Sequence, residues 1–186
     1  MNIKGNKHWR ETDDAIMATV IRMTEQRDIF KVSVTAVCTE LGINRSTFYE
    51  HFDNVIEVLE TAERHYGEEL AEAITEGQAI SRHAAFLALF SHVRAHAAFY
   101  RAHLRRGGHI KALSEAFSPS ALMRAFPSYT PEELAYHLEF FRGGVEALAL
   151  HWIEGGCKET SEDMCLILVR EYEARQWAND GSESAI

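Results

Sequence analysis

The sequence is poor in the residues that interrupt helices or cross-link small folds. Its three prolines all lie between residues 119 and 131, so residues 1–118 contain none. No run of about 18 apolar residues occurs, and this excludes a membrane-spanning helix. The three cysteines are an odd number without Cys-x-x-Cys spacing, which argues against a disulfide framework. Residues 1–14 lack the apolar segment of a secretory signal. We therefore expect a cytoplasmic protein.

The N-terminal quarter of the chain has no net charge, and the net negative charge is concentrated in the rest. Residues 1–52 carry seven Lys or Arg and seven Asp or Glu, so the net charge of −9 arises from residues 53–186. Because an acidic surface repels a polyanion, any contact with nucleic acid should be confined to the N-terminal end. The same asymmetry is equally compatible with a solvated acidic surface on an ordinary globular protein.

Apolar residues recur with helical spacing, and no strand pattern or internal repeat is present. The sequence predicts an all-α protein of about nine helices, over residues 12–26, 33–41, 45–52, 55–77, 80–98, 110–117, 120–126, 131–154 and 162–177. Thr12 is expected to cap the first helix, and Thr130, Pro131 and Glu133 form a capping-box pattern. We expect a DNA-binding domain over residues 1–54, a larger helical domain over 55–178 and a disordered tail over 179–186.

The segment LGINRSTFYEHF, residues 41–52, contains the most informative pattern. Two short helices joined by a turn containing Gly42 are typical of a helix-turn-helix, whose second helix enters the major groove. Phe48 and Phe52 lie four residues apart and can pack inward. A helical hairpin that only buries aromatic residues is about equally compatible with this spacing. The hydrogen-bond donors of the second helix are Arg45, Ser46, Thr47, Tyr49 and His51.

This segment resembles the DNA-binding domain of TetR-type transcriptional regulators. The pattern G-[VI]-x-x-x-T-[FL]-Y-x-H-F is matched at Gly42, Ile43, Thr47, Phe48, Tyr49, His51 and Phe52. Residues 99–113 and 140–164 are similar to a subgroup of dihydroxyacetone-kinase regulators. The resemblance implies a homodimer that binds a palindromic operator in double-stranded DNA. It also implies an unidentified small-molecule effector. Repression is commoner than activation in such proteins, but the subgroup includes activators, so a transcriptional activator is the alternative.

The resemblance also assigns roles to individual residues. It implies a phosphate contact for Ser33, a phosphate or base contact for Thr35, base contacts for Arg45 and Ser46, and phosphate contacts for Thr47, Tyr49 and His51. A basic N-terminal arm would comprise Lys4, Lys7 and Arg10. One position departs from the family, because Val55 stands where a phosphate-binding lysine is usual.

The C-terminal domain is expected to form the dimer and to hold the effector. A stripe of small and aromatic residues predicts a dimer interface of Phe140, Gly144, Ala147, His151, Leu168 and Tyr172, for which a larger monomeric bundle is the alternative. The effector pocket is expected to involve Phe86, Phe90, Phe117, His137 and Phe141. Pockets and cores share this composition, so plain core residues remain an alternative for each.

Other chemistry receives little support from the sequence. Ten histidines include His92 and His96 at i, i+4 spacing, but no HExxH motif and no spaced Cys/His set accompanies them. No glycine-rich phosphate loop, G-x-S-x-G motif or convergent acid–base set occurs. We therefore expect no metal, no cofactor and no enzymatic activity, with a metal-binding helical enzyme as the alternative class.

Overall fold

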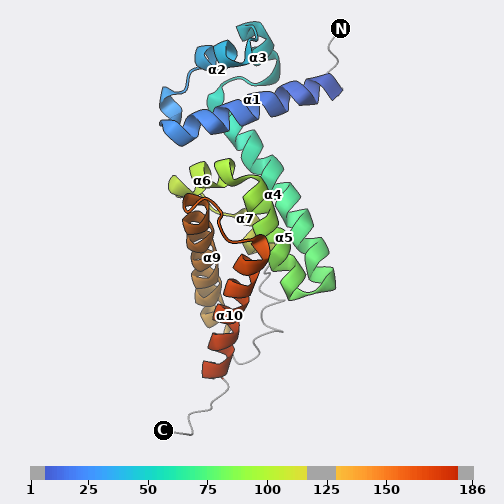
Figure 1. Cartoon of the computed structure of the whole chain (residues 1–186), viewed down its shortest axis with the longest axis vertical. Helices are drawn as coiled ribbons and strands as arrows, with labels where there is room; N and C mark the ends of the chain where they lie inside the picture. The colour runs from blue at the N-terminus through green and yellow to red at the C-terminus, as the bar shows by residue number, and fades with distance from the viewer. Residues whose placement is uncertain (1–6, 117–128, 180–186) are drawn as a thin grey trace. The chain divides into compact units, whose positions relative to one another are not determined.

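The computed structural model describes residues 7–116 and 129–179 (Figure 1), and within these ranges it is all-helical without a strand. The elements are α1 (Lys7–Gln26), the 3-10 turn η1 (Ile29–Lys31), α2 (Val34–Leu41), α3 (Arg45–His51), α4 (Val55–Ile80), α5 (Arg82–Ala95), α6 (Ala97–Arg105), α7 (Lys111–Ala116), α9 (Pro131–Glu154) and α10 (Ser161–Asn179). The predicted all-α class is confirmed. No helix in the described part of the chain is long and apolar enough to span a membrane.

The chain divides into two compact units. The first contains the residues up to Tyr66 together with Ala98–Arg106, and the second contains Gly67–Ala97 and the residues from Gly107 onward. The boundary between the two compact units therefore falls inside α4. The predicted functional domains meet at residue 55, and this boundary stays a prediction. The predicted tail lies outside the described residues, apart from Asn179 at the end of α10.

The first helix is longer than its predicted range. It is described from Lys7, and Thr12 lies inside it, donating its hydroxyl to the carbonyl of His8 at 3.0 Å. Thr12 is therefore not the cap, because residues 7–11 contain no helix breaker and are already helical. Lys7 and Arg10, expected in a basic arm, belong to this helix, while Lys4 lies outside the described residues.

The first unit is built around the apolar face of α1. Ile16 and Val20 are fully buried, as are Val37 of α2 and Phe48 of α3. Burial of such side chains contributes roughly 1.5–3 kcal/mol each, so this small core fixes α2 and α3 against α1. An ion pair between Arg22 of α1 and Glu40 of α2 lies at the surface of the same contact.

The end of α4 differs from the prediction. The helix continues through Gly77 to Ile80, and Ser81 then caps α5 by accepting a hydrogen bond from the backbone N–H of Ala84 at 3.0 Å. Gly77 is needed for packing rather than for termination, because a Cβ at this position would lie 2.7 Å from Cα of Ala85. The predicted helix over 80–98 is divided in two, since α5 ends before His96 and α6 begins at Ala97.

The second unit confirms the predicted start of α9. Thr130 accepts a hydrogen bond from the N–H of Glu133 at 3.2 Å, and the Glu133 carboxylate accepts one from the N–H of Thr130 at 2.7 Å. Hydrogen bonds from the backbone N–H and from the side chain of Thr130 to the Glu133 carboxylate lower the pKa of Glu133 below its ordinary value. Thr160 and Asp163 form the same reciprocal pair before α10. In Figure 1, α9 and α10 lie side by side in this unit.

Candidate nucleic-acid interface

The α2–turn–α3 segment has the local geometry of a helix-turn-helix. Ser33 caps α2 by accepting a hydrogen bond from the N–H of Ala36 at 3.2 Å. Gly42 ends that helix in the left-handed region, at φ 67°, where residues with a Cβ are disfavoured. Phe48 is fully buried, and its ring centroid lies 6.2 Å from that of Phe52. The inward face of α3 is therefore aromatic, as predicted.

The outer face of α3 carries an ordered pair of polar side chains. Nη2 of Arg45 donates a hydrogen bond to Oη of Tyr49 at 3.2 Å, and the guanidinium carbon lies 5.8 Å from the centre of the tyrosine ring. Both side chains are exposed, and so is Ser46 between them in sequence. The pKa of Arg45 is raised, chiefly by this hydrogen bond. This face of α3 thus presents the Arg45 guanidinium and the Tyr49 hydroxyl to solvent.

The other residues expected to contact DNA occupy different environments. Ser33 and Thr35 are exposed at the start of α2, and Thr47 is half-buried on α3. Asn44, at the N-cap position of α3, makes no side-chain capping bond. The exposed Asn44 amide therefore makes no hydrogen bond to the first turn of α3. The sequence pattern did not indicate this.

His51, which is expected to contact a phosphate, lies against α1. Its Nδ1 lies 2.6 Å from Oδ1 of Asp13, and its ring centroid lies 3.9 Å from that of Trp9. Its side chain has no exposed area, because α1 covers it. In this position the imidazole joins α3 to α1, and its contact with a phosphate stays a prediction. Sequence patterns do not indicate this contact, since Asp13 and His51 are far apart along the chain.

The start of α4 lacks the features of a phosphate-binding helix terminus. Val55, which occupies the usual lysine position, is buried. Asn54 accepts hydrogen bonds from the N–H groups of Ile56 and Glu57, at 2.9 and 3.0 Å. The Glu57 carboxylate in turn accepts one from the N–H of Asp53 at 2.5 Å. A phosphate here would meet two acidic side chains, and this favours α2 and α3 as the contact surface.

An apolar groove runs along α9 and α10 in the second unit. It has a volume of about 270 Å³ and is lined by Phe140, Phe141, Gly144, Val145, Leu148, Ile167, Leu168 and Glu171. Phe140 is 59% exposed, and Gly144, Ala147 and His151 continue an exposed stripe along α9. Leu168 is buried, and between Ser161 and Glu171 the exposed large apolar residues of α10 are instead Leu166 and Ile167. The side chain of Tyr172 lies outside the described residues.

The predicted effector-pocket residues are mainly packed against other rings. Phe86 and Phe90 are buried, with ring centroids 6.1 Å from Phe141 and 5.8 Å from Trp152 respectively. His137 is half-buried, and its ring centroid lies 5.6 Å from that of Tyr129. Phe117 lies outside the described residues. These contacts describe an aromatic core, and a pocket within it stays a prediction.

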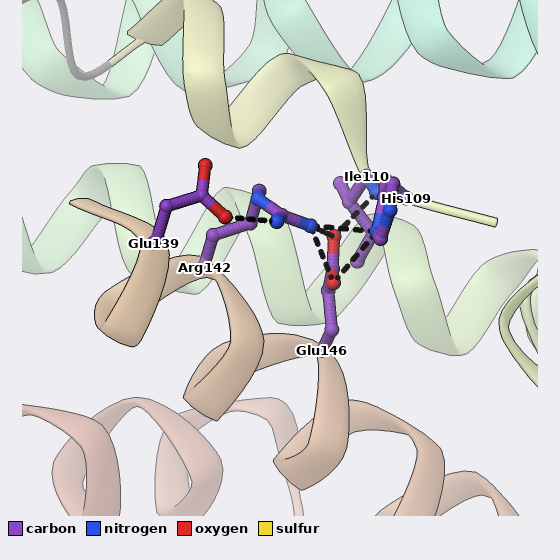
Figure 2. A network of polar contacts seen from close by, with 5 residues as sticks. All are labelled: His109, Ile110, Glu139, Arg142 and Glu146. Carbon is purple, nitrogen blue, oxygen red and sulfur yellow. Dashed lines mark hydrogen bonds and ion pairs between the residues drawn. The ribbon is translucent and has the colours of Figure 1, made fainter. Parts of the chain in front are cut away.

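Figure 2 shows a polar network that joins α9 to the segment before α7. Glu146, which is buried, accepts a hydrogen bond from the N–H of Ile110 at 2.9 Å and one from Arg142 at 3.1 Å. Nδ1 of His109 lies 2.6 Å from Nη1 of Arg142. Hydrogen bonding to Glu139 is the main cause that raises the pKa of Arg142. The buried carboxylate is thus paired, as its burial requires.

Comparison with solved structures identifies the fold of the chain. The sequence matches no known protein-family model and no curated protein. A TetR-family transcriptional regulator from Streptomyces coelicolor is 19% identical, with a TM-score of 0.62, over 94% of this chain and 81% of that one. The fatty acid degradation regulator FadR from Bacillus halodurans is 13% identical, with a TM-score of 0.66, over 90% and 94%. The chain therefore has the fold of TetR-type regulators.

Proposed function

We propose that the chain is a sequence-specific DNA-binding transcriptional regulator with α3 as its recognition helix. The observation that carries this function is the exposed Arg45–Tyr49 pair on a helix whose opposite face is fixed by buried Phe48. A recognition helix needs this combination of an anchored inner face and polar residues near its N-terminus. The fold shared with two transcriptional regulators supports the assignment.

Roles within the interface follow from position and chemistry. Arg45 and Ser46, at the N-terminus of α3, read base edges in the major groove, where an arginine can bind guanine O6 and N7. Ser33, Thr35, Thr47 and Tyr49 contact the phosphate backbone through their hydroxyl groups. His51 acts indirectly, by fixing the orientation of α3 against α1.

The functional unit of this proposal is a homodimer. The α9–α10 groove and the exposed Tyr136, Phe140, Leu166 and Ile167 form an apolar face in a strongly acidic part of the chain. A second copy of the same face would cover it through an isologous two-fold contact. Two recognition helices about 34–36 Å apart would then match the half-sites of a palindromic operator. Release from the operator by a small molecule completes the proposed repressor mechanism.

The charges of the helix-turn-helix segment predict how strongly the DNA affinity depends on salt concentration. Within residues 31–52, Lys31 and Arg45 are balanced by Glu40 and Glu50, so few cations are available for phosphates. Each neutralised phosphate contributes about −0.9 to the slope of log K against log salt. Because Arg45 is assigned to base edges, two copies of Lys31 give a slope of about −2 from this segment.

Fluorescence anisotropy with a labelled duplex from the region upstream of the coding sequence, titrated at several salt concentrations, tests the function. We expect saturable binding that weakens with salt and is competed poorly by a shuffled duplex. Absence of binding, or an affinity that does not change with salt, would refute a DNA-binding regulator. Equal competition by the shuffled duplex would refute sequence specificity.

A further inference from the structure

We propose that the second unit contains a binding site for a divalent transition-metal ion of the Zn²⁺ class, formed by Glu69 of α4 with His92 and His96 of α5 and its C-terminal cap. One ligand atom from each of these three residues lies within 4.8 Å of the other two. Two imidazoles and one carboxylate are a common ligand set of protein zinc sites that keep an open coordination position. This inference is independent of the proposed DNA-binding function.

The backbone fixes the two histidines one helical turn apart. His92 lies in the last turn of α5, and His96 caps that helix by donating its N–H to the carbonyl of His92 at 3.1 Å. Their ring centroids are 4.5 Å apart, with the ring planes 47° from each other. An i, i+4 histidine pair on one helical face is the arrangement by which zinc-binding helices present two nitrogen ligands.

The third ligand comes from the neighbouring helix of the same unit. Oε2 of Glu69 lies 3.8 Å from Nε2 of His96, and the Glu69 side chain is 44% exposed. The α4–α5 hairpin is tight, because the backbone of Gly77 approaches that of Ala85 too closely to admit a Cβ. The backbone of Glu69 is therefore held near the histidine pair by a close-packed connection between the two helices.

The observed separations suit a metal ion after a small closure. Zinc lies about 2.0–2.2 Å from nitrogen and oxygen ligands, so tetrahedral ligand atoms are about 3.3 Å apart. The 3.8 Å between Oε2 of Glu69 and Nε2 of His96 is the distance that a bound ion would shorten. Imidazole ligands favour Zn²⁺, Cu²⁺ and Ni²⁺ over Mg²⁺ and Ca²⁺, which prefer oxygen ligands. With three protein ligands, the fourth position is left for water or a small molecule.

Isothermal titration of the full, untagged chain with Zn²⁺ tests the site, since a histidine tag would bind the metal itself. Titration with Co²⁺ adds a spectroscopic readout, because four-coordinate cobalt absorbs visible light. We expect one strong site per chain and an increase in thermal stability with metal concentration, because only the folded chain assembles the three ligands. No binding to the native chain would overturn the proposal.

Ligand variants distinguish this site from adventitious binding by other histidines or cysteines. Glu69→Gln and His96→Gln change half-exposed side chains, so the fold is expected to persist, and each should weaken Zn²⁺ binding at least about 10-fold. His8→Gln is the matched control, because His8 is highly exposed on α1, and it should bind Zn²⁺ as the native chain does. Unchanged zinc affinity and cobalt absorption in Glu69→Gln and His92→Gln/His96→Gln would refute the assignment.

Discussion

Arg45 and Tyr49 are joined by a hydrogen bond across one turn of α3, with 3.2 Å between the guanidinium nitrogen and the phenolic oxygen. The family resemblance implies base reading for the arginine and backbone contact for the tyrosine, and both roles stay predictions. In the structure the tyrosine hydroxyl also accepts a hydrogen bond that restrains the arginine. Because ordering a long side chain costs about 1–2 kcal/mol of rotamer entropy, such a restraint can improve recognition before any DNA is bound.

A double-mutant cycle on these two residues tests their coupling. Arg45→Ala should weaken the specific duplex by about 1–3 kcal/mol and relax sequence preference. Tyr49→Phe keeps the ring but removes the acceptor, so it should weaken binding by a smaller amount. The double variant should differ from the sum of the two by at least about 0.5 kcal/mol. Anisotropy with specific and shuffled duplexes measures all four proteins, and strictly additive losses would show that the pair does not act as a unit.

The Asp13–His51 contact leads to a prediction about stability rather than chemistry at the DNA surface. His51 is covered by α1 and lies 2.6 Å from the Asp13 carboxylate. Asp13→Asn or His51→Ala should therefore lower the free energy of unfolding by about 1–3 kcal/mol, as expected when a buried hydrogen-bond partner is removed. Urea denaturation followed by circular dichroism measures this loss.

Asp14 provides a matched control for that measurement. It is adjacent to Asp13 but exposed, so Asp14→Asn should leave the urea midpoint nearly unchanged. If His51→Ala kept native stability and lost DNA affinity uniformly across sequences, the imidazole would be a phosphate contact after all. That result would require α1 to uncover His51 in the complex.

Local signals explain which parts of the fold were predictable. Thr130, Pro131 and Glu133 lie within four consecutive residues, and their capping box forms as predicted because every partner is close in sequence. Gly42 likewise ends α2 through its own backbone conformation. Gly77 was misinterpreted as a helix end, since nothing near it in sequence shows that Ala85 will pack against its α-carbon. Whether a glycine ends a helix or allows close packing within it can be decided only from the tertiary structure.

The candidate sites show the same limit. The outward position of Arg45 and the inward position of Phe48 follow from helical periodicity, so the face of α3 was predictable. The covering of His51 was not, because it depends on Trp9 and Asp13 across the α1–α3 contact. Glu69 was missed as a possible metal ligand for the same reason. The sequence shows His92 and His96 together, but only the packing of α4 against α5 adds the carboxylate.

The apolar face of α9 and α10 gives a prediction about assembly. Phe140→Asp places a charge on the exposed rim of the groove and should convert a dimer to a monomer, because an unpaired charge would be buried in the contact. Phe30→Asp is the matched control, since Phe30 is 83% exposed but belongs to the first unit. Light scattering after size exclusion measures the mass. A native chain that is monomeric, or equal dissociation by both variants, would remove α9 and α10 as the interface.

Two glycines of α4 should respond oppositely to the same substitution. Gly67 has open space around it, so Gly67→Ala should stabilise the helix by about 0.5–1 kcal/mol through reduced backbone entropy. At Gly77 an added Cβ would lie 2.7–2.9 Å from the backbone of Ala84 and Ala85, and backbone atoms cannot yield as a flexible side chain can. Gly77→Ala should therefore lower the melting temperature despite its better helix propensity. Thermal unfolding of both variants decides this, and stabilisation by both would show that the α4–α5 hairpin is looser than the structure indicates.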